Sequence, residues 1–166
     1  KGDFQFEDIT DVAGVGGEKS WSTGVSLADI NADGFLDIYV SNSGDIKGDN
    51  KQNELFINNG DLTFTEMAKE YGLDDKGYST HAAFFDFDRD GDLDCYLLNN
   101  SYKGGFRITS IGKDQRPVRD EVGGDKLFEN DNGKFIDISE EAGIYGSVIG
   151  FGLGVTVGDA NNDGWM

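Results

Sequence analysis

The sequence predicts an all-β protein made of β-propeller blades, each with four antiparallel strands. Two repeated features predict this fold: a phenylalanine segment that ends in glycine, and an acidic, glycine-containing loop that begins about 22–24 residues later. Each feature occurs three times among the 166 residues. The composition indicates the same fold, because 25 glycines and a single proline are typical of short strands joined by tight turns.

The phenylalanine segment is predicted to form the outer strand of a blade. It lies at residues 6–14, 64–72 and 135–143, where Phe, an acid, an aliphatic residue and the final Gly keep the same offsets. Its alternation of apolar and polar residues is typical of a strand with one face in solvent.

The other three strands of each blade are predicted from short runs around the acidic loops. The runs directly before and after a loop are largely apolar, as expected of strands covered on both faces. The runs before the loops are 24–28, 82–85 and 154–158, those after them are 36–40 and 93–98, and the third strands are 54–60 and 126–130. The loops begin at Asp29, Asp86 and Asp159, so the unit recurs after 57 and then 73 residues, a period typical of propeller blades.

These repeats divide the chain into four parts. We expect the outer strand of a preceding blade with its connection at 1–23, a first complete blade at 24–80, a second at 81–150 with an insertion at 99–125, and the inner strand and truncated acidic loop of a third at 151–166. Because a ring needs about 4–8 blades, we expect a fragment of a larger propeller of about seven blades. The remaining blades would come from the same chain or an associated one.

The charge of the chain excludes several classes of partner. With 32 acidic and 14 basic residues the formal net charge is −18, which predicts repulsion from nucleic acid and from anionic membrane surfaces. No apolar run approaches the roughly 20 residues that span a bilayer, so no membrane span is predicted. The single cysteine, Cys95, excludes an intramolecular disulfide, and its apolar surroundings predict a buried side chain.

The acidic loops have the spacing Asp-x-Asn/Asp-x-Asp-Gly-x-x-Asp, which predicts calcium sites. Ca²⁺ is bound by about 6–8 oxygens, and side chains at positions 1, 3 and 5 converge when a glycine at position 6 allows a sharp turn. Position 7 offers its backbone carbonyl. The predicted ligands are Asp29, Asn31, Asp33, the Phe35 carbonyl and Asp37 in the first loop; Asp86, Asp88, Asp90, the Asp92 carbonyl and Asp94 in the second; and Asp159, Asn161, Asp163 and the Trp165 carbonyl in the third. The third loop has no ninth position, so we expect its site to be weak or empty.

Other proteins use similar loops. An EF-hand or dockerin loop needs an acid at position 12 and a helix on each side, whereas position 12 is Val40 in the first loop and Leu97 in the second, and the flanking runs favour strands. Thrombospondin-type calcium repeats need many cysteines. The simplest alternative, that the loops are ordinary Asp- and Gly-rich turns without metal, stays open.

Residues 151–159, which run into Asn161, Asn162, Asp163 and Gly164, resemble the FG-GAP repeat of integrin α-chain propellers. The fuller cycle of phenylalanine segment, acidic loop, Leu-Asp-Ile-Tyr-Val and Leu-Phe-Ile-Asn-Asn-Gly is similar to the bacterial FG-GAP/VCBS group that includes cartilage-acidic-protein-like sequences. This resemblance implies a secreted or cell-surface propeller, extracellular or outer-membrane-associated, in which calcium fastens the first hairpin of each blade. It implies no chemistry, because the superfamily includes adhesion modules, carbohydrate-binding pieces and polysaccharide lyases.

We therefore expect a non-catalytic calcium-binding module for extracellular binding or adhesion, with an unidentified protein or glycan as its ligand. One alternative is the propeller domain of a secreted carbohydrate-active enzyme whose catalytic residues lie outside this chain, and another is a structural spacer between domains. No catalytic residue is predicted, because His81 has no evident catalytic partner in the sequence.

A basic stretch at residues 102–119 interrupts the second predicted blade. It contains five basic residues, Lys103, Arg107, Lys113, Arg116 and Arg119, against one acid. It is expected either to contact a partner, a glycan or an anionic ligand, or to pack on acidic neighbouring blades.

Overall fold

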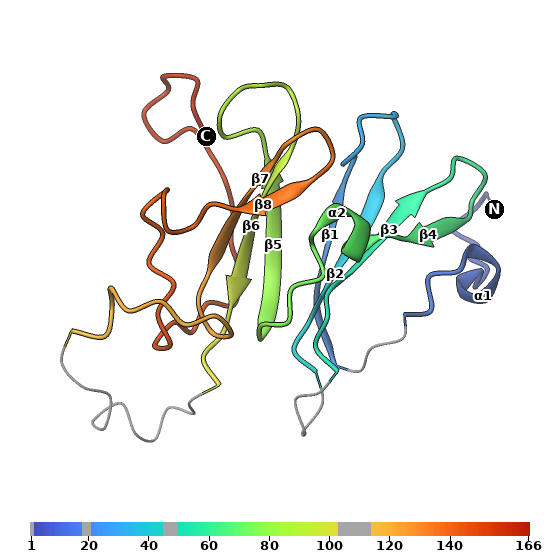
Figure 1. Cartoon of the computed structure of the whole chain (residues 1–166). Coiled ribbons are helices and arrows are strands. Elements are labelled where there is room, and N and C mark those ends of the chain that lie inside the picture. The colour runs from blue at the N-terminus through green and yellow to red at the C-terminus, as the bar shows by residue number, and fades with distance from the viewer. Residues whose placement is uncertain (1, 18–20, 45–49, 103–113) are drawn as a thin grey trace.

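The computed structural model, which describes residues 2–17, 21–44, 50–102 and 114–166, is all-β, with two four-stranded antiparallel sheets (Figure 1). In each sheet the strands lie in chain order, so consecutive strands are hydrogen-bonded neighbours. The first sheet contains β1 (Ser22–Ala28), β2 (Asp37–Asn42), β3 (Glu54–Asn58) and β4 (Phe64–Glu66). The second contains β5 (Ser79–Phe85), β6 (Asp94–Asn99), β7 (Lys126–Asn130) and β8 (Phe135–Asp137). The all-β prediction is confirmed, and both sheets are consistent with blades of a propeller.

The two sheets repeat each other in detail. The acidic loop joins β1 to β2 in the first sheet and β5 to β6 in the second, so it closes a hairpin rather than linking two helices. Each hairpin has the same irregularity at its open end, between Ser22 and Gly24 or between Ser79 and His81. The β-hairpin setting of the loops is therefore as the sequence predicts.

The sheets pack through their first strands, β1 and β5. Side-chain hydroxyls of β1 donate to backbone carbonyls of β5, from Thr23 to Ser79 O at 2.6 Å and from Ser26 to Ala82 O at 2.6 Å. A Cβ at Gly24 would lie 2.3 Å from the carbonyl oxygen of Thr80, so only glycine allows this approach. The strands touch closely because β1 offers small and hydroxylated side chains to the seam.

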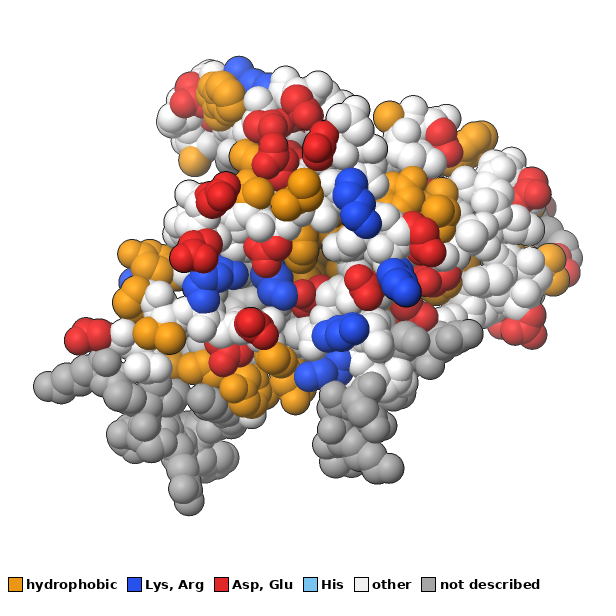
Figure 2. All heavy atoms as spheres, in the orientation of Figure 1, with side chains coloured by type: hydrophobic (Ala, Val, Ile, Leu, Met, Phe, Trp, Pro, Cys, Tyr) orange, Lys and Arg blue, Asp and Glu red, His pale blue; other side chains and the backbone are white. Residues whose placement is uncertain are grey.

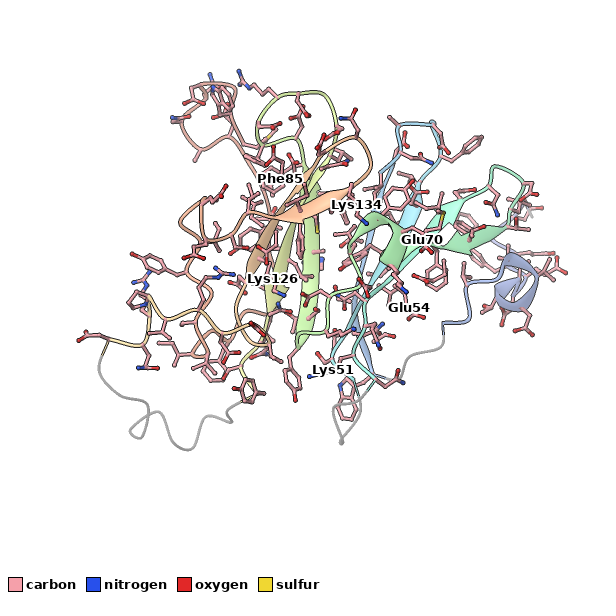
Figure 3. The ribbon with its side chains drawn as sticks, viewed as in Figure 1. Lys51, Glu54, Glu70, Phe85, Lys126 and Lys134 are labelled. Carbon is pink, nitrogen blue, oxygen red and sulfur yellow. The ribbon has the colours of Figure 1, made fainter. Side chains whose placement is uncertain are left out.

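Lysines add contacts at the outer part of the seam (Figure 3). Lys134, between β7 and β8, donates to the Glu70 carbonyl at 2.8 Å, and Lys126 on β7 forms an ion pair with Asp75. Both acceptors belong to the segment that leaves the first sheet. The second sheet is thus held along its inner strand and at its outer strands.

The same seam continues beyond the second sheet. Thr80 donates to Gly152 O at 3.0 Å, as Thr23 does to Ser79 O, and Phe151 forms an isolated bridge with Asn100. Residues 151–158, expected as an inner strand, nevertheless do not form a strand, and neither do residues 6–9, expected as part of an outer strand. A strand needs a hydrogen-bonded neighbour along its length. Among the described residues, the segment 151–158 has only the isolated bridge at Phe151 as strand pairing, and the segment 6–9 has none. The division into blades at 24–80 and 81–150 stays a prediction.

Two helical turns were not foreseen. α1 (Thr10–Ala13) and α2 (Ala68–Tyr71) occupy the second half of the phenylalanine segment, and each ends at a glycine in the left-handed conformation, Gly14 with φ 74° and Gly72 with φ 84°. The third copy closes in the same way at Gly143, with φ 72°. The recurring glycine is therefore a helix or turn C-cap. Within the described ranges, neither helix is long and apolar enough to cross a membrane.

The core lies between the two sheets and under α2. Tyr39, Leu55, Leu97 and Cys95 are fully buried in one apolar cluster, which confirms the expected burial of the cysteine. The Tyr39 ring meets Phe84 edge-on at 5.6 Å between centroids, and its hydroxyl donates to Leu73 O. Each sheet therefore depends on its neighbour for a covered face.

The seam gives a first prediction. Gly24→Ala should destabilise the chain by about 1–3 kcal/mol, because the new methyl overlaps the backbone of β5. The matched control is Gly154→Ala, since a Cβ at that position meets nothing within 4 Å. Urea unfolding of both variants tests this, and equal stabilities would contradict the packing described for β1 and β5.

Candidate calcium sites

The three acidic loops share one backbone conformation. Positions 4 and 6 both have positive φ in every loop, although only position 6 is always glycine. The pairs are Ala32 and Gly34, Arg89 and Gly91, and Asn162 and Gly164. The loop shape is therefore a property of the spacing, and it tolerates a bulky residue at position 4.

The carboxylate at position 1 lies inside the turn. Its Oδ2 accepts the N–H of the position-6 glycine: Gly34 to Asp29 at 2.9 Å, Gly91 to Asp86 at 3.2 Å and Gly164 to Asp159 at 2.6 Å. The carboxylate at position 5 accepts the N–H of position 7, as at Asp33, Asp90 and Asp163. These bonds wind the backbone around a group of oxygen atoms.

The ninth position differs from the others because it is buried. Asp37 and Asp94 are 0% and 1% exposed. In each, Oδ2 accepts a loop N–H, from Ile30 or Phe87, and Oδ1 accepts an N–H of the third strand, from Asn58 or Asn130, all at 2.8–2.9 Å. This aspartate therefore joins the loop to the third strand. Burial raises the pKa of both carboxyls, and the loop acids add to the rise.

The second loop has the geometry of a cation site. Carboxylate oxygens of Asp86, Asp88 and Asp94 lie within 4.8 Å of one another. Oxygens that bind one Ca²⁺ at about 2.3–2.6 Å are separated by at most about twice that distance, so these three suit such an ion. The Asp92 side chain adds to the negative charge. Its Oδ1 is buried without a hydrogen-bond partner, and burial, followed by the charge of Asp90, raises its pKa to about 6.

The first and third loops are arranged slightly differently. Asn31 and Asn161, at position 3, donate their side-chain N–H to the position-5 aspartate at 2.9 and 2.8 Å. Their Oδ1 atoms accept the N–H of the same aspartate. In these two loops, a neutral amide therefore stands at position 3, where the second loop has the carboxylate of Asp88. The ligand assignments for all three loops, including the carbonyls of Phe35, Asp92 and Trp165, stay predictions.

The second and third loops touch. The Arg89 guanidinium lies 4.0 Å from the centroid of the Trp165 ring, a cation–π contact between position 4 of one loop and position 7 of the next. Figure 2 shows acidic side chains gathered at this end of the molecule, with Lys and Arg side chains across the middle of the same face. Arg89 thus places one positive charge between two acidic loops.

The other predicted candidates have structural contacts. Arg119 donates to the carbonyls of Ile144 and Asp125, and Arg116 lies 4.8 Å from the Tyr145 ring centroid. Residues 103–113 of the basic stretch, with Lys103, Arg107 and Lys113, lie outside the described residues. His81 accepts the Val155 N–H through Nδ1 at 3.3 Å.

Comparison with known proteins places the first two of these loops in a repeat family. Residues 21–57 match the FG-GAP repeat, and residues 43–97 match the FG-GAP-like repeat. Cartilage acidic protein 1 of Xenopus tropicalis is 32% identical over 119 residues, which are 68% of this chain and 17% of that protein. The chain therefore spans less than a fifth of the length of this relative. The recognition of FG-GAP repeats in the sequence is confirmed.

The raised carboxyl pKa values predict how stability depends on pH without metal. An acid whose pKa is higher in the folded than in the unfolded chain binds more protons when folded, so stability rises as pH falls through the folded pKa. Asp92, with a pKa of about 6, and Asp37 and Asp94, whose pKa values are raised, all act in this direction. In excess chelator, the melting temperature should be higher at about pH 5 than at about pH 7.5.

The control for this experiment is Asp92→Asn, which should reduce the rise. Saturating calcium should reverse the sign, because a bound cation requires deprotonated carboxylates. A melting temperature that falls between pH 7.5 and 5 in chelator would show that these carboxyls do not govern the pH dependence.

Substitutions at the buried ninth position and at position 3 of the second loop distinguish a structural role from a role in binding metal. Asp94→Ala leaves the N–H groups of Phe87 and Asn130 without their acceptor, at a cost of about 1–3 kcal/mol each, whether or not calcium is present. In chelator, Asp88→Ala should keep or slightly raise stability, because the Asp88 carboxylate repels Asp94 and accepts only one exposed hydrogen bond, from the Asp90 N–H. The same variant should remove the calcium-dependent part of the stability. Paired unfolding curves in calcium and in chelator measure both effects. Equal losses for the two variants in chelator would contradict the distinction.

Proposed function

We propose that this chain, which belongs to the FG-GAP repeat family, is a calcium-stabilised and non-catalytic β-propeller module for binding or adhesion outside the cell. The observation that carries the proposal is the second acidic loop, where three carboxylates converge beside a buried, unpartnered Asp92 oxygen. The name of the relative, a cartilage acidic protein, supports the extracellular location.

Electrostatics supports the calcium part of this proposal. Carboxylates that lie within 5 Å of one another repel strongly once water is partly excluded, and the chain already has a net charge of −18. A divalent cation would offset this repulsion and satisfy the oxygen atoms that backbone N–H groups leave available. The residues suit Ca²⁺ better than Zn²⁺, because all the side-chain donors are oxygens, whereas zinc sites are built mainly from His and Cys.

Two observations support a role without catalysis. The Cys95 thiol is fully buried and burial raises its pKa, so it is a poor nucleophile. His81 faces the continuing seam, where its Nδ1 accepts a backbone hydrogen bond. Cys95 belongs to the apolar core, and His81 contributes a hydrogen bond to the seam.

The test is calcium-dependent unfolding of this chain. Thermal unfolding in millimolar Ca²⁺ should occur well above the transition in excess chelator, because a ligand at a hundredfold excess over Kd adds about 2.7 kcal/mol to the stability of the native state. Mg²⁺ should add less, since it requires a smaller octahedral site. A cooperative transition that is the same in calcium and in chelator would show that the loops are ordinary turns.

A further inference from the structure

The ends of the strands opposite the acidic loops form a second feature. A hollow of about 380 Å³ opens where β1 and β5 begin and β2 and β6 end, at the lower end of the sheets in Figure 1. Trp21, Tyr78 and Leu153 supply its apolar lining. Its volume lies within the range of about 300–1,000 Å³ that is usual for small-molecule sites.

The lining described for this hollow contains no charged side chain, although 28% of the residues in the chain are charged. Besides the apolar residues it contains only hydroxyl and amide side chains, among them Thr23, Thr80, Ser43 and Asn100. Such a lining has no charged side chain to offset the charge of an anion or a metal ion. It suits a neutral ligand that has both an apolar face and many hydrogen-bonding groups.

Trp21 is the residue that most needs an explanation. Its side chain is 64% exposed, and its backbone has φ +69°, a conformation that is unfavourable for a bulky residue. The backbone is held there because the Trp21 carbonyl accepts the Ser43 N–H at 3.1 Å. Strain of this kind, kept at an exposed aromatic side chain beside a hollow, is typical of a binding position.

The hydroxyl groups of the lining are oriented by the fold. Thr23 and Ser43 donate to Ser79 O, and Thr80 donates to Gly152 O. Because the protons of these three hydroxyls are used in this way, their oxygen atoms keep acceptor lone pairs. The Asn100 side chain contributes an amide, which both donates and accepts. A ligand rich in hydroxyl donors matches these acceptors.

The Tyr78 ring of the lining is also held in place. Tyr78 stacks on Tyr102 with the ring centroids 5.7 Å apart, and Lys51 Nζ lies 4.3 Å from the Tyr78 centroid. Since these contacts occupy Tyr78, Trp21 is the ring with the largest exposed area in the lining. A flat apolar ring face beside fixed hydroxyl acceptors is complementary to a pyranose, which has C–H groups on its faces and hydroxyls at its edge.

We propose that this hollow binds a neutral sugar unit of a glycan, which stacks on Trp21 and donates hydroxyl protons to the lining. The site gives a ligand class to the binding role proposed above, but it does not require calcium in the acidic loops. Failure of the calcium test and failure of this proposal are therefore separate results.

The test is titration of the whole chain, in excess calcium, with cellobiose, maltose, lactose, mannobiose and chitobiose, followed by tryptophan fluorescence and by saturation-transfer NMR. At least one disaccharide should bind saturably. Trp21→Asn should weaken that binding at least about tenfold, since exposed aromatic anchors commonly dominate a small interface. Asparagine tolerates positive φ, so this variant should keep or increase the melting temperature.

Trp165→Ala is the matched control, because Trp165 is the other tryptophan, is half-exposed and lies in the third acidic loop. It should bind the sugar as the original chain does. Asn100→Ala provides a second variant in the lining and should also weaken binding. The proposal is overturned if no disaccharide saturates, if Trp21→Asn binds normally, if both tryptophan variants lose binding equally, or if only a sulfated saccharide or a peptide binds.

Discussion

A buried aspartate in each sheet, Asp37 or Asp94, holds the acidic loop and the third strand together. Each carboxylate receives one N–H from its own loop and one from β3 or β7, so a single side chain fixes parts of the chain that are 21 or 36 residues apart. Burial of a charge is costly, and two hydrogen bonds offset only part of that cost. The part of the burial cost that the hydrogen bonds do not offset raises the pKa of both carboxyls. A cation in the loop would stabilise the same negative charge without disturbing either hydrogen bond, because each oxygen keeps a free lone pair.

Both sheets have these hydrogen bonds, but they differ in the charged residues at the start of the third strand. At the start of the third strand the second sheet has Lys126, which pairs with Asp75 three residues after the C-cap glycine of α2. The first sheet has Glu54 there, 4% exposed, and Gly17 stands in place of the aspartate. The Asn42 amide donates to Glu54 at 3.1 Å. The ion pair therefore belongs to the second sheet, whereas the hydrogen bonds from backbone N–H groups to Asp37 or Asp94 occur in both sheets.

Much of this arrangement could be predicted from the sequence because it depends on period and spacing. The strands flank loops whose Asp and Gly positions recur, and the left-handed glycine at position 6 follows from the motif. The helical turns could not be foreseen in the same way, because their four residues are too few for a helical period and only the C-cap Gly72 signals them. The alternation of apolar and polar residues over 64–72 predicts a strand along the whole segment.

Other features of the sites depend on tertiary contacts that no local pattern encodes. The sequence spacing assigns Asp94 as one ligand among several, but its bond to Asn130 becomes visible only when β7 is placed beside β6. The Asp92 side chain is similar: the motif uses only its backbone carbonyl, while the fold buries one oxygen of its carboxylate near the charge of Asp90. The aspartate at position 9 could have been suspected from the strand that it begins, since a charged residue at the start of an apolar run needs a partner.

The two ends of each sheet have opposite chemistry, and the inner strands account for the difference. β1 runs from the hydroxyl-lined hollow to the acidic loop, and its hydroxyls bond to β5 along the way. Because those bonds and Gly24 bring the two backbones into contact, the seam has little freedom to shift when one end is altered. A cation at the loops would therefore act on the hollow through the stability of the whole sheet pair rather than by reshaping it. This separation lets the acidic end contribute to stability independently of the side chains that the hollow presents at the other end.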